Sequence, residues 1–285
     1  MLGAIIGDII GSPYEFHNIK SKDFELFCDR CCFTDDTILT CATAEWLLSA
    51  KKPEEFLKKW GNLYKDRTYE NGEIGAFGKG FSHWLENGQP YGAKTNGCIM
   101  RLSPITFLID DKKEAMDRAV ELTSITHNHE ESILATRAYI ETMYMAKRGI
   151  SVPIIKNCIT HKYGYDLSKS VDEIRSNYNK FYVSCKNSVP QAIVCALDAN
   201  SYEDAIRNAV SLGGDSDTLA CMAGGIAELR FDIPENIKNM AEKYMDDRVL
   251  NTVAEFYKAL GAKKANSNDK QINFNSVVAV ETHIR

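Results

Sequence analysis

Two short acidic clusters carry most of the chemistry that the sequence offers. One runs from Phe33 to Thr37 (FTDDT) and the other from Gly213 to Thr218 (GGDSDT). Each places two carboxylates and neighbouring hydroxyls at the start of an apolar, helix-like stretch. Carboxylate and hydroxyl oxygens are the ligands that hard divalent cations such as Mg²⁺ prefer. We therefore expect the fold to bring the two clusters together, because neither one alone holds enough ligands for two metals.

The spacing within each cluster affects what it could bind. Asp35 and Asp36 are neighbours, so at a helix start their side chains diverge by about 100° and can address two cations, or one cation from two sides. Asp215 and Asp217 are two positions apart, which places both on one side of an extended turn. Ser, Thr and Asp at these positions also act as ordinary helix caps. The residues alone leave a metal site and simple capping as equal alternatives.

Composition and charge narrow the class of protein. The chain has 285 residues, 44% of them hydrophobic and 26% charged, which is typical of a globular protein with a substantial core. A net charge of −5 offers no electrostatic footprint for nucleic acid, so no such partner is expected. No stretch has the roughly 20 apolar residues of a membrane span. The first ten residues lack the basic start of a signal peptide, and we expect a cytoplasmic protein with reduced thiols.

The nine cysteines include one compact run, Cys28, Cys31 and Cys32. A zinc site is one interpretation of this run, but no second Cys/His pair stands at a suitable spacing. We therefore interpret these residues as small, partly buried thiols.

Helical periodicity dominates the chain, and we predict one all-α domain over residues 1–260. Convincing β-alternation is nearly absent before residue 272, whereas about a fifth to a quarter of an average protein is strand. In residues 2–11, Gly3, Gly7 and Gly11 share one helical face, which suits a buried helix closely approached by another element. The later predicted helices cover residues 37–49, 54–64, 113–123, 130–148, 152–161, 170–177, 202–212, 219–230, 234–244 and 247–260. A further Ala-rich helix is predicted to open at Val189-Pro190-Gln191 and to end at Ala199.

Two segments depart from this helical pattern. Residues 66–97 are rich in Gly, Asn and Tyr, and their aromatic residues indicate one short helix inside a long ordered loop. Residues 261–285 form a predicted tail. The alternation from Ile272 to Ile284 is compatible with a terminal strand, a partner-docking segment or disorder.

Five motifs, in this order, give the chain a resemblance to a known family. They are GDIIGSPYE from Gly7 to Glu15, FTDDT from Phe33 to Thr37, NGCIMR from Asn96 to Arg101, THNH from Thr126 to His129, and SLGGDSDT from Ser211 to Thr218. Over residues 2–257 the chain resembles the ADP-ribosylglycohydrolase family. The resemblance implies an all-α fold around two Mg²⁺ or Mn²⁺ ions. It also implies cleavage at C1″ of the distal ribose of an ADP-ribosyl group.

The resemblance assigns roles to single positions. Those that match the family's metal ligands are Thr34, Asp35, Asp36, Asp215, Asp217 and Thr218. Glu15 matches a glutamate that lies over the ribose, and the expected catalytic residues are Glu15, Asp36 and Asp217. Those that match segments contacting or bordering the substrate are Asn96, Gly97, Cys98, Ile99, Met100, Arg101, His127 and Asn128. The chain departs from close bacterial relatives at Cys98, Glu130 and Ser132.

These residues suit chemistry at an anomeric carbon. Two cations can bind ribose hydroxyls and lower the pKa of a bound water, and a carboxylate can stabilise oxocarbenium character. We expect Glu15 to activate the water or to stabilise that charge. Backbone amides near residues 96–99 could hold the diphosphate. Arg101 is equally compatible with phosphate binding and with a structural ion pair.

Plainer roles are expected for Asp8 and for the two histidines of the fourth motif. Asp8, mid-helix beside glycines, is expected to support the site or the fold rather than to bind substrate. His127 and His129 are expected to be helix caps or hydrogen-bonded core residues, because Mg²⁺ and Mn²⁺ prefer oxygen ligands.

The predicted function is hydrolysis of the N-glycosidic bond between ADP-ribose and an acceptor, with the arginine guanidinium as the expected acceptor. Hydrolysis of another linkage, such as O-acetyl-ADP-ribose or a serine adduct, is the alternative among enzymes. The alternative that is not an enzyme is a non-catalytic ADP-ribose-binding protein. The presence of all four aspartates favours the enzyme. The expected partners are ADP-ribosylated proteins or small-molecule ADP-ribose conjugates, and we expect a monomer.

Overall fold

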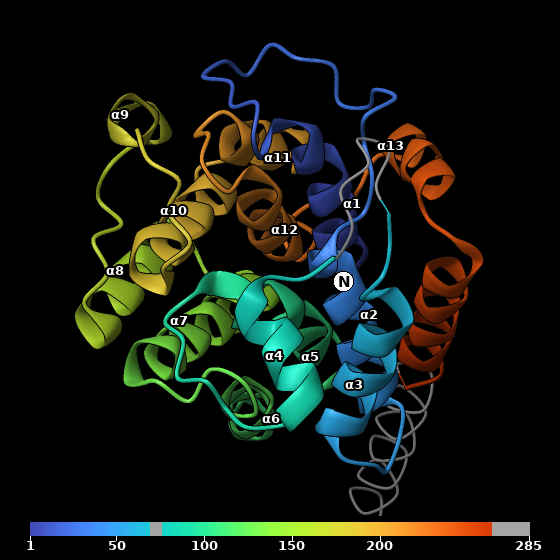
Figure 1. Ribbon diagram of the computed structural model, residues 1–285. Coiled ribbons are helices and arrows are strands. Elements are labelled where there is room, and N and C mark those ends of the chain that lie inside the picture. The colour runs from blue at the N-terminus through green and yellow to red at the C-terminus, as the bar shows by residue number, and fades with distance from the viewer. Residues whose placement is uncertain (69–75, 264–285) are drawn as a thin grey trace, which may run out of the picture.

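The computed structural model describes residues 1–68 and 76–263, which form helices around a central pair (Figure 1). The first helices are α1 (Leu2–Gly11), α2 (Asp35–Leu47), α3 (Pro53–Tyr64), α4 (Lys79–Asn87), α5 (Ser103–Leu108), α6 (Lys112–Ser124) and α7 (Glu130–Lys147). The later ones are α8 (Val152–Tyr163), α9 (Val171–Asn177), α10 (Cys185–Leu197), α11 (Tyr202–Val210), α12 (Ser216–Ala227) and α13 (Glu235–Ala241), followed by helical residues 247–263. Short 3₁₀ helices are η1 (Ser12–Tyr14), η2 (Asn96–Cys98), η3 (Met100–Leu102) and η4 (Glu242–Tyr244).

The predicted all-α class is confirmed. Within the described ranges no residue belongs to a β-strand, and an isolated antiparallel bridge joins Thr95 to Ser184. The short helix predicted inside the loop of residues 66–97 is α4. None of the described helices combines the length and apolarity needed to cross a bilayer. The predicted strand or docking segment at the C-terminal end lies outside the described residues.

The close approach predicted for the first helix is made by α12. A Cβ atom added to Gly7 would lie 2.2 Å from the carbonyl oxygen of Ala220, and one added to Gly11 would lie 2.5 Å from the Cα of Asp217. Real Cβ contacts are much longer, so the two backbones touch along the glycine face of α1. The end of α1 therefore lies directly against the first turn of α12, which carries the second acidic cluster.

The remaining helices enclose this pair. α12 is buried along its whole length and packs against α10 and α11 as well as α1. α2 packs against α1, α3 and α5, while α6 and α7 pair with each other and α7 also contacts α10 (Figure 1). The first turns of α2 and α12 thereby both adjoin α1.

The acidic clusters lie inside the first turns of their helices. The sequence predicted starts at residues 37 and 219, but α2 begins at Asp35 and α12 at Ser216. Thr34 explains the earlier start of α2, because its backbone is extended and its hydroxyl oxygen accepts from the Asp36 amide (3.4 Å). Negative side chains in a first helical turn are favoured by the free N–H groups there.

α10 departs from its predicted boundaries. We predicted that Val189, Pro190 and Gln191 open it, but the helix begins at Cys185 and contains Pro190 in its interior. Proline lacks the N–H that would bond the carbonyl four residues earlier, which is why the first turn was its expected place. The bridge determines the start instead, because the Cys185 amide donates to the carbonyl of Lys94 (2.7 Å) on a segment far away in sequence.

Candidate active site

Asp8 connects α1 to the first acidic cluster. Its buried carboxylate accepts hydrogen bonds from the amide (2.9 Å) and hydroxyl (2.7 Å) of Thr34 and from the amide of Thr37 (3.0 Å). The Thr37 hydroxyl donates to the same carboxylate. Buried polar groups require such partners, so Asp8 holds the N-terminus of α2 against α1. These contacts agree with the supporting role expected for Asp8.

Asp36 joins the two clusters directly. The hydroxyl of Thr218 on α12 donates to Asp36 Oδ2 (3.2 Å). The other oxygen of Asp36, Oδ1, is buried and has no hydrogen-bond donor within the described part of the chain. A buried carboxylate oxygen without a donor is unfavourable. A divalent cation would satisfy it.

The second cluster is presented by a two-glycine turn. Gly213 and Gly214 have φ of +71° and +74°, in the left-handed region that glycine adopts without strain. The turn brings Asp215 to Asn96, whose Nδ2 donates to Asp215 Oδ2 (2.6 Å). The 3₁₀ helix η2 therefore meets the N-terminus of α12 at this aspartate.

The carboxylates form two overlapping groups. One consists of Asp8, Asp36 and Asp217, and the other of Glu15, Asp215 and Asp217. Within each group, one oxygen from every residue lies within 4.8 Å of the others. Oxygen ligands of one cation stand about 2.0–2.6 Å from it, so such oxygens can share an ion. Because Asp217 belongs to both groups, the arrangement fits two neighbouring cations.

Asp35 has a different environment from the other aspartates. It is half-buried and belongs to neither group of converging oxygens. The carboxylates of the groups still affect its ionisation. Burial and the charges of Asp8 and Asp215 raise the pKa of Asp35 to about 7. Asp35 therefore responds to the charges of the centre without contributing one of its converging oxygens.

Crowding also raises the pKa of the buried carboxyl groups. Burial and the nearby Asp8 hold the pKa of Asp36 well above its usual range, and burial does the same for Asp217. Burial raises the pKa of Asp215 too, against the hydrogen bond from Asn96. A buried carboxyl group ionises less readily when other negative charges are close to it, whereas a bound cation favours its ionised form. The electrostatics of the centre therefore suit a metal ion.

The side chains of the predicted substrate segment, residues 96–101, are largely turned away from solvent. Those of residues 98–100 are buried in the core. That of Asn96 is buried and bonded to Asp215. A substrate would therefore meet the backbone of this segment rather than its side chains.

The backbone amides of the segment differ in whether they have an acceptor within the protein. The amide of Asn96 donates to the Val183 carbonyl (2.8 Å), and that of Ile99 donates to the Asn96 carbonyl (2.7 Å). In a 3₁₀ helix each amide bonds the carbonyl three residues earlier, so Cys98 is in register with Thr95, the N-cap of η2. Gly97 lies in the first turn, where its amide has no acceptor inside the helix and can serve an anion.

Arg101 is fully buried and has neutral partners. Its Nη2 donates to the Leu122 carbonyl (3.1 Å) and the Thr126 hydroxyl (2.8 Å). Its Nε and Nη1 have no hydrogen-bond partner in the described part of the chain. Arg101 therefore forms no ion pair with a carboxylate among the residues that the structure describes. Its charge lies behind the substrate segment and acts on Asp35 through space.

His127 is a hydrogen-bonded core residue, and Asn128 is exposed. The ring of His127 lies between Thr126 Oγ1 (2.8 Å from Nδ1) and Thr95 Oγ1 (2.9 Å from Nε2). Burial and the charge of Arg101 lower the pKa of His127 to about 3, so the ring is neutral. Because Arg101 donates to the Thr126 oxygen, the Thr126 proton is available to Nδ1, and this favours the proton on Nε2.

An exposed aromatic pair beside Glu15 was missed from the sequence. Phe16 is 69% exposed and Phe181 is 45% exposed, and their rings stack 5.8 Å apart with an angle of 5° between planes. Such a pair offers a flat apolar surface near the carboxylates. The position of Phe16 next to Glu15 was a usable signal, but nothing in the sequence linked Phe181 to it.

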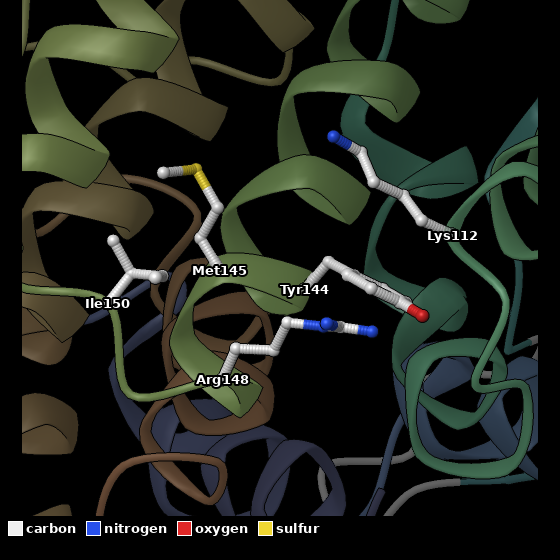
Figure 2. Close-up of a pocket in the computed structure, with 5 residues that line it drawn as sticks. All are labelled: Lys112, Tyr144, Met145, Arg148 and Ile150. Atoms are coloured by element: carbon white, nitrogen blue, oxygen red, sulfur yellow. The ribbon is translucent and has the colours of Figure 1, made fainter.

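A separate pocket contains none of the predicted site residues. Figure 2 shows its lining residues, Lys112, Tyr144, Met145, Arg148 and Ile150. Lys112 is paired with Glu141, and the Arg148 guanidinium lies 5.1 Å from the centre of the Tyr144 ring. Its cationic groups are therefore already engaged, and the carboxylate centre remains the better candidate for chemistry.

The fold and the carboxylate groups define an all-α protein whose two helix N-termini converge on an oxygen-rich centre suited to divalent cations. The model of the family described as ADP-ribosylglycohydrolase matches residues 1–265, and the chain belongs to this family. The family is one of hydrolases, so the protein is an enzyme of this class.

Named relatives agree with this assignment. The chain is 27% identical to the ADP-ribosylarginine hydrolase Tri1 of Pseudomonas putida, over 85% of this chain and 73% of that protein. It is 23% identical to the ADP-ribosylhydrolase ARH3 of Mus musculus, over 88% of each. A solved structure described as an ADP-ribosylglycohydrolase-related protein complex covers 91% of this chain and 95% of its own with a TM-score of 0.63. At 19% identity that likeness shows a shared fold.

Proposed function

We propose that this protein is a metal-dependent hydrolase that removes ADP-ribose from arginine by cleaving the N-glycosidic bond at C1″ of the distal ribose. The observation that carries the proposal is the overlap of the two carboxylate groups at Asp217, with Glu15 in one of them. The two groups provide adjoining cation positions, and the Glu15 carboxylate lies at one of them. Hydrolysis at an anomeric carbon uses both.

The proposed ligands of two Mg²⁺ or Mn²⁺ ions are Thr34, Asp35, Asp36, Asp215, Asp217 and Thr218. Three of them, Asp36, Asp215 and Asp217, belong to the converging groups, and the hydroxyls of Thr34 and Thr218 lie against Asp36. When bound, the ions would supply positive charge to ribose hydroxyls and to a water whose pKa they lower. Thr34 donates its proton to Asp8, so its oxygen can offer a cation the lone pair that does not accept from the Asp36 amide. Asp8 accepts several hydrogen bonds and acts by holding α2 in place.

Glu15 is the proposed catalytic carboxylate. It is half-buried on the turn after η1, and it lies within the group that contains Asp215 and Asp217. From there its carboxylate can take a proton from water or face positive charge that develops at C1″. Asp36 and Asp217, the other predicted catalytic residues, act by placing the reacting ribose.

The diphosphate would lie against η2. The amide of Gly97 would donate to a phosphate oxygen there, and the buried Arg101 on the following 3₁₀ helix would add positive charge. His127, neutral and held between two threonine hydroxyls, gives this segment a rigid support. A Cβ atom added to Gly97 would lie 3.8 Å from His127 Nε2, which indicates how closely the ring backs the segment.

The arginine linkage is supported by the likeness to a protein named ADP-ribosylarginine hydrolase. The likeness to proteins named ADP-ribosylhydrolase is compatible with other linkages, and serine or O-acetyl conjugates remain the alternative substrates. The third hypothesis is that the same site binds ADP-ribose without catalysing a reaction. The four aspartates and Glu15 favour catalysis over binding.

The direct test is a panel of arginine-linked, serine-linked and acetyl-linked ADP-ribose, each with Mg²⁺ and with Mn²⁺. We expect release of ADP-ribose from the arginine conjugate, none in chelator, and none from the Asp217→Ala variant. Release only from the serine or acetyl conjugate would replace the proposed linkage. Binding of free ADP-ribose without release from any conjugate would identify a binding protein.

A further inference from the structure

Asn18 joins the turn that carries Glu15 to the turn that presents Asp215. The two hydrogens of its Nδ2 are shared among the carbonyls of Tyr14 (2.7 Å), Glu15 (2.8 Å) and Gly214 (3.0 Å). Its Oδ1 accepts from the amide of Gly214 (2.7 Å). One amide side chain thus makes a reciprocal pair with Gly214 and caps the Glu15 turn, although 196 residues separate it from Gly214.

We propose that Asn18 is a positioning residue that couples Glu15 to the metal-binding turn of residues 213–215. The proposal rests on the function proposed above, since it assumes that Glu15 and the metal ligands act on one substrate. Through Asn18, displacement of either turn is transmitted to the other. Glu15 therefore reaches its working position when the Asp215 turn does.

The turn at Gly213 and Gly214 needs contacts from outside the turn to fix its conformation. Gly213 and Gly214 both adopt left-handed angles, and glycine loses more conformational freedom on ordering than any other residue. Asn18 packs closely here, because a Cβ atom added to Gly213 would lie 3.3 Å from the Asn18 side chain. Without that contact, two consecutive glycines would let Asp215 drift away from the other carboxylates.

Lys20 strengthens the same junction from one turn further along. Its Nζ donates to the carbonyls of Leu212 and Tyr178. The segment after Glu15 is therefore hydrogen-bonded to the backbone of residues 212–214 at two residues, Leu212 and Gly214. Asn18 bonds Gly214, the nearer of the two to the proposed ligand Asp215. Asn18 is the better position to test, because its bonds reach both Glu15 and Gly214 while Lys20 bonds neither.

An amide suits this place better than a charged group would. Glu15, Asp215 and Asp217 are all close to the junction, so another carboxylate would add repulsion in the metal-free protein. A primary amide supplies donors and an acceptor without charge. Neither alanine nor the similarly sized leucine can form any of these bonds.

The test compares Asn18→Ala and Asn18→Leu with the wild-type full chain and with Asn62→Ala. Asn62 is an exposed asparagine on α3 whose Nδ2 donates to the Lys58 carbonyl within the same helix, so it is a matched control. The probe is Mn²⁺ followed by isothermal titration calorimetry. We expect both Asn18 variants to bind Mn²⁺ about tenfold more weakly, as for loss of other groups that orient metal ligands. Asn62→Ala should match the wild type.

A second readout separates positioning from general destabilisation. At saturating Mn²⁺, Asn18→Ala should lower kcat on an arginine conjugate about tenfold or more, with KM nearly unchanged. On a Glu15→Gln background, Asn18→Ala should weaken Mn²⁺ binding as before but cause no further loss of the residual kcat. A purely structural role would lower kcat by the same factor in both backgrounds.

Two results would overturn the proposal: Mn²⁺ affinity and kcat of both Asn18 variants equal to those of Asn62→Ala, or a loss of kcat independent of Glu15. Absence of ADP-ribose release by the wild type on every conjugate would instead overturn the proposed function. In that case the Mn²⁺ titration of the same variants still decides whether Asn18 positions the metal-binding turn.

Discussion

The carboxylate of Asp8 accepts hydrogen bonds from both the amide (2.9 Å) and the hydroxyl (2.7 Å) of Thr34. This pair joins the middle of the buried helix α1 to the residue that caps α2. Since α1 also touches the first turn of α12, one helix sets the relative position of both acidic clusters. The geometry of the centre thus depends on a residue that need not bind substrate.

Asp8→Ala should lower the free energy of unfolding of the metal-free protein by about 2–6 kcal/mol. The variant leaves the Thr34 and Thr37 amides buried without an acceptor, at about 1–3 kcal/mol each. Asp8→Asn should lose less, because its amide oxygen can still accept from both. Urea denaturation in chelator measures the difference. Equal stability of Asp8→Ala and wild type would contradict the bridging role of Asp8.

Gly7→Ala should destabilise the fold by about 3 kcal/mol or more, because its Cβ would force apart two packed backbones. The new atom would lie 2.2 Å from the Ala220 carbonyl oxygen. Gly261→Ala is the control, since its added Cβ has nothing within 4 Å and it lies exposed in the helical residues 247–263, where alanine is favoured over glycine. That variant should be unchanged or more stable by up to about 1 kcal/mol. Chemical denaturation of both proteins tests the pair, and similar effects would contradict the close helix approach.

Helix class and the glycine face of α1 could be predicted because both depend on local periodicity. The start of α10 could not, because it is set by a bond between Cys185 and Lys94, which are distant in the chain. The earlier start of α12 likewise depends on the left-handed turn at Gly213 and Gly214. Tertiary contacts decide where such helices begin, and propensity alone does not reveal them.

Asn96→Ala should weaken Mn²⁺ binding by about 10–100-fold, the usual effect of removing a group that orients a metal ligand. The reason is the 2.6 Å bond from Asn96 Nδ2 to Asp215 Oδ2. Calorimetric titration of the purified variant gives the affinity. If Mn²⁺ affinity were unchanged and KM alone rose, Asn96 would contact substrate as the sequence suggested and would not orient Asp215.

His127 should make the protein less stable as pH falls. Its pKa is about 3 in the folded protein and about 6.5 unfolded, so the unfolded state binds a proton first. The stabilisation is complete above about pH 6.5 and is lost by about 1.4 kcal/mol per pH unit below it. Between pH 7.5 and pH 5, the stability of the wild type relative to His127→Gln should fall by about 2 kcal/mol. Urea titrations at both values test this, and a constant difference would contradict a neutral buried ring.

The site could be predicted as a set of positions but not as a geometry. The two acidic clusters could be recognised from their residue types. The two groups of carboxylates that share Asp217 form only because α1 contacts both α2 and α12. Asp8 and Asn18 act through hydrogen bonds to residues 26 and 196 positions away, and no local pattern reports such contacts. Arg101 shows the opposite case, since its charge suggested phosphate binding or an ion pair, while the buried guanidinium has neutral partners.

The most direct test is one titration of metal-free protein with Mn²⁺ in which bound metal and ADP-ribose released from an arginine conjugate are measured together. We predict no release without metal, and release that rises as the second equivalent binds to the centre shared through Asp217. Full release by the metal-free protein in the presence of a chelator would contradict the proposed metal-dependent hydrolysis.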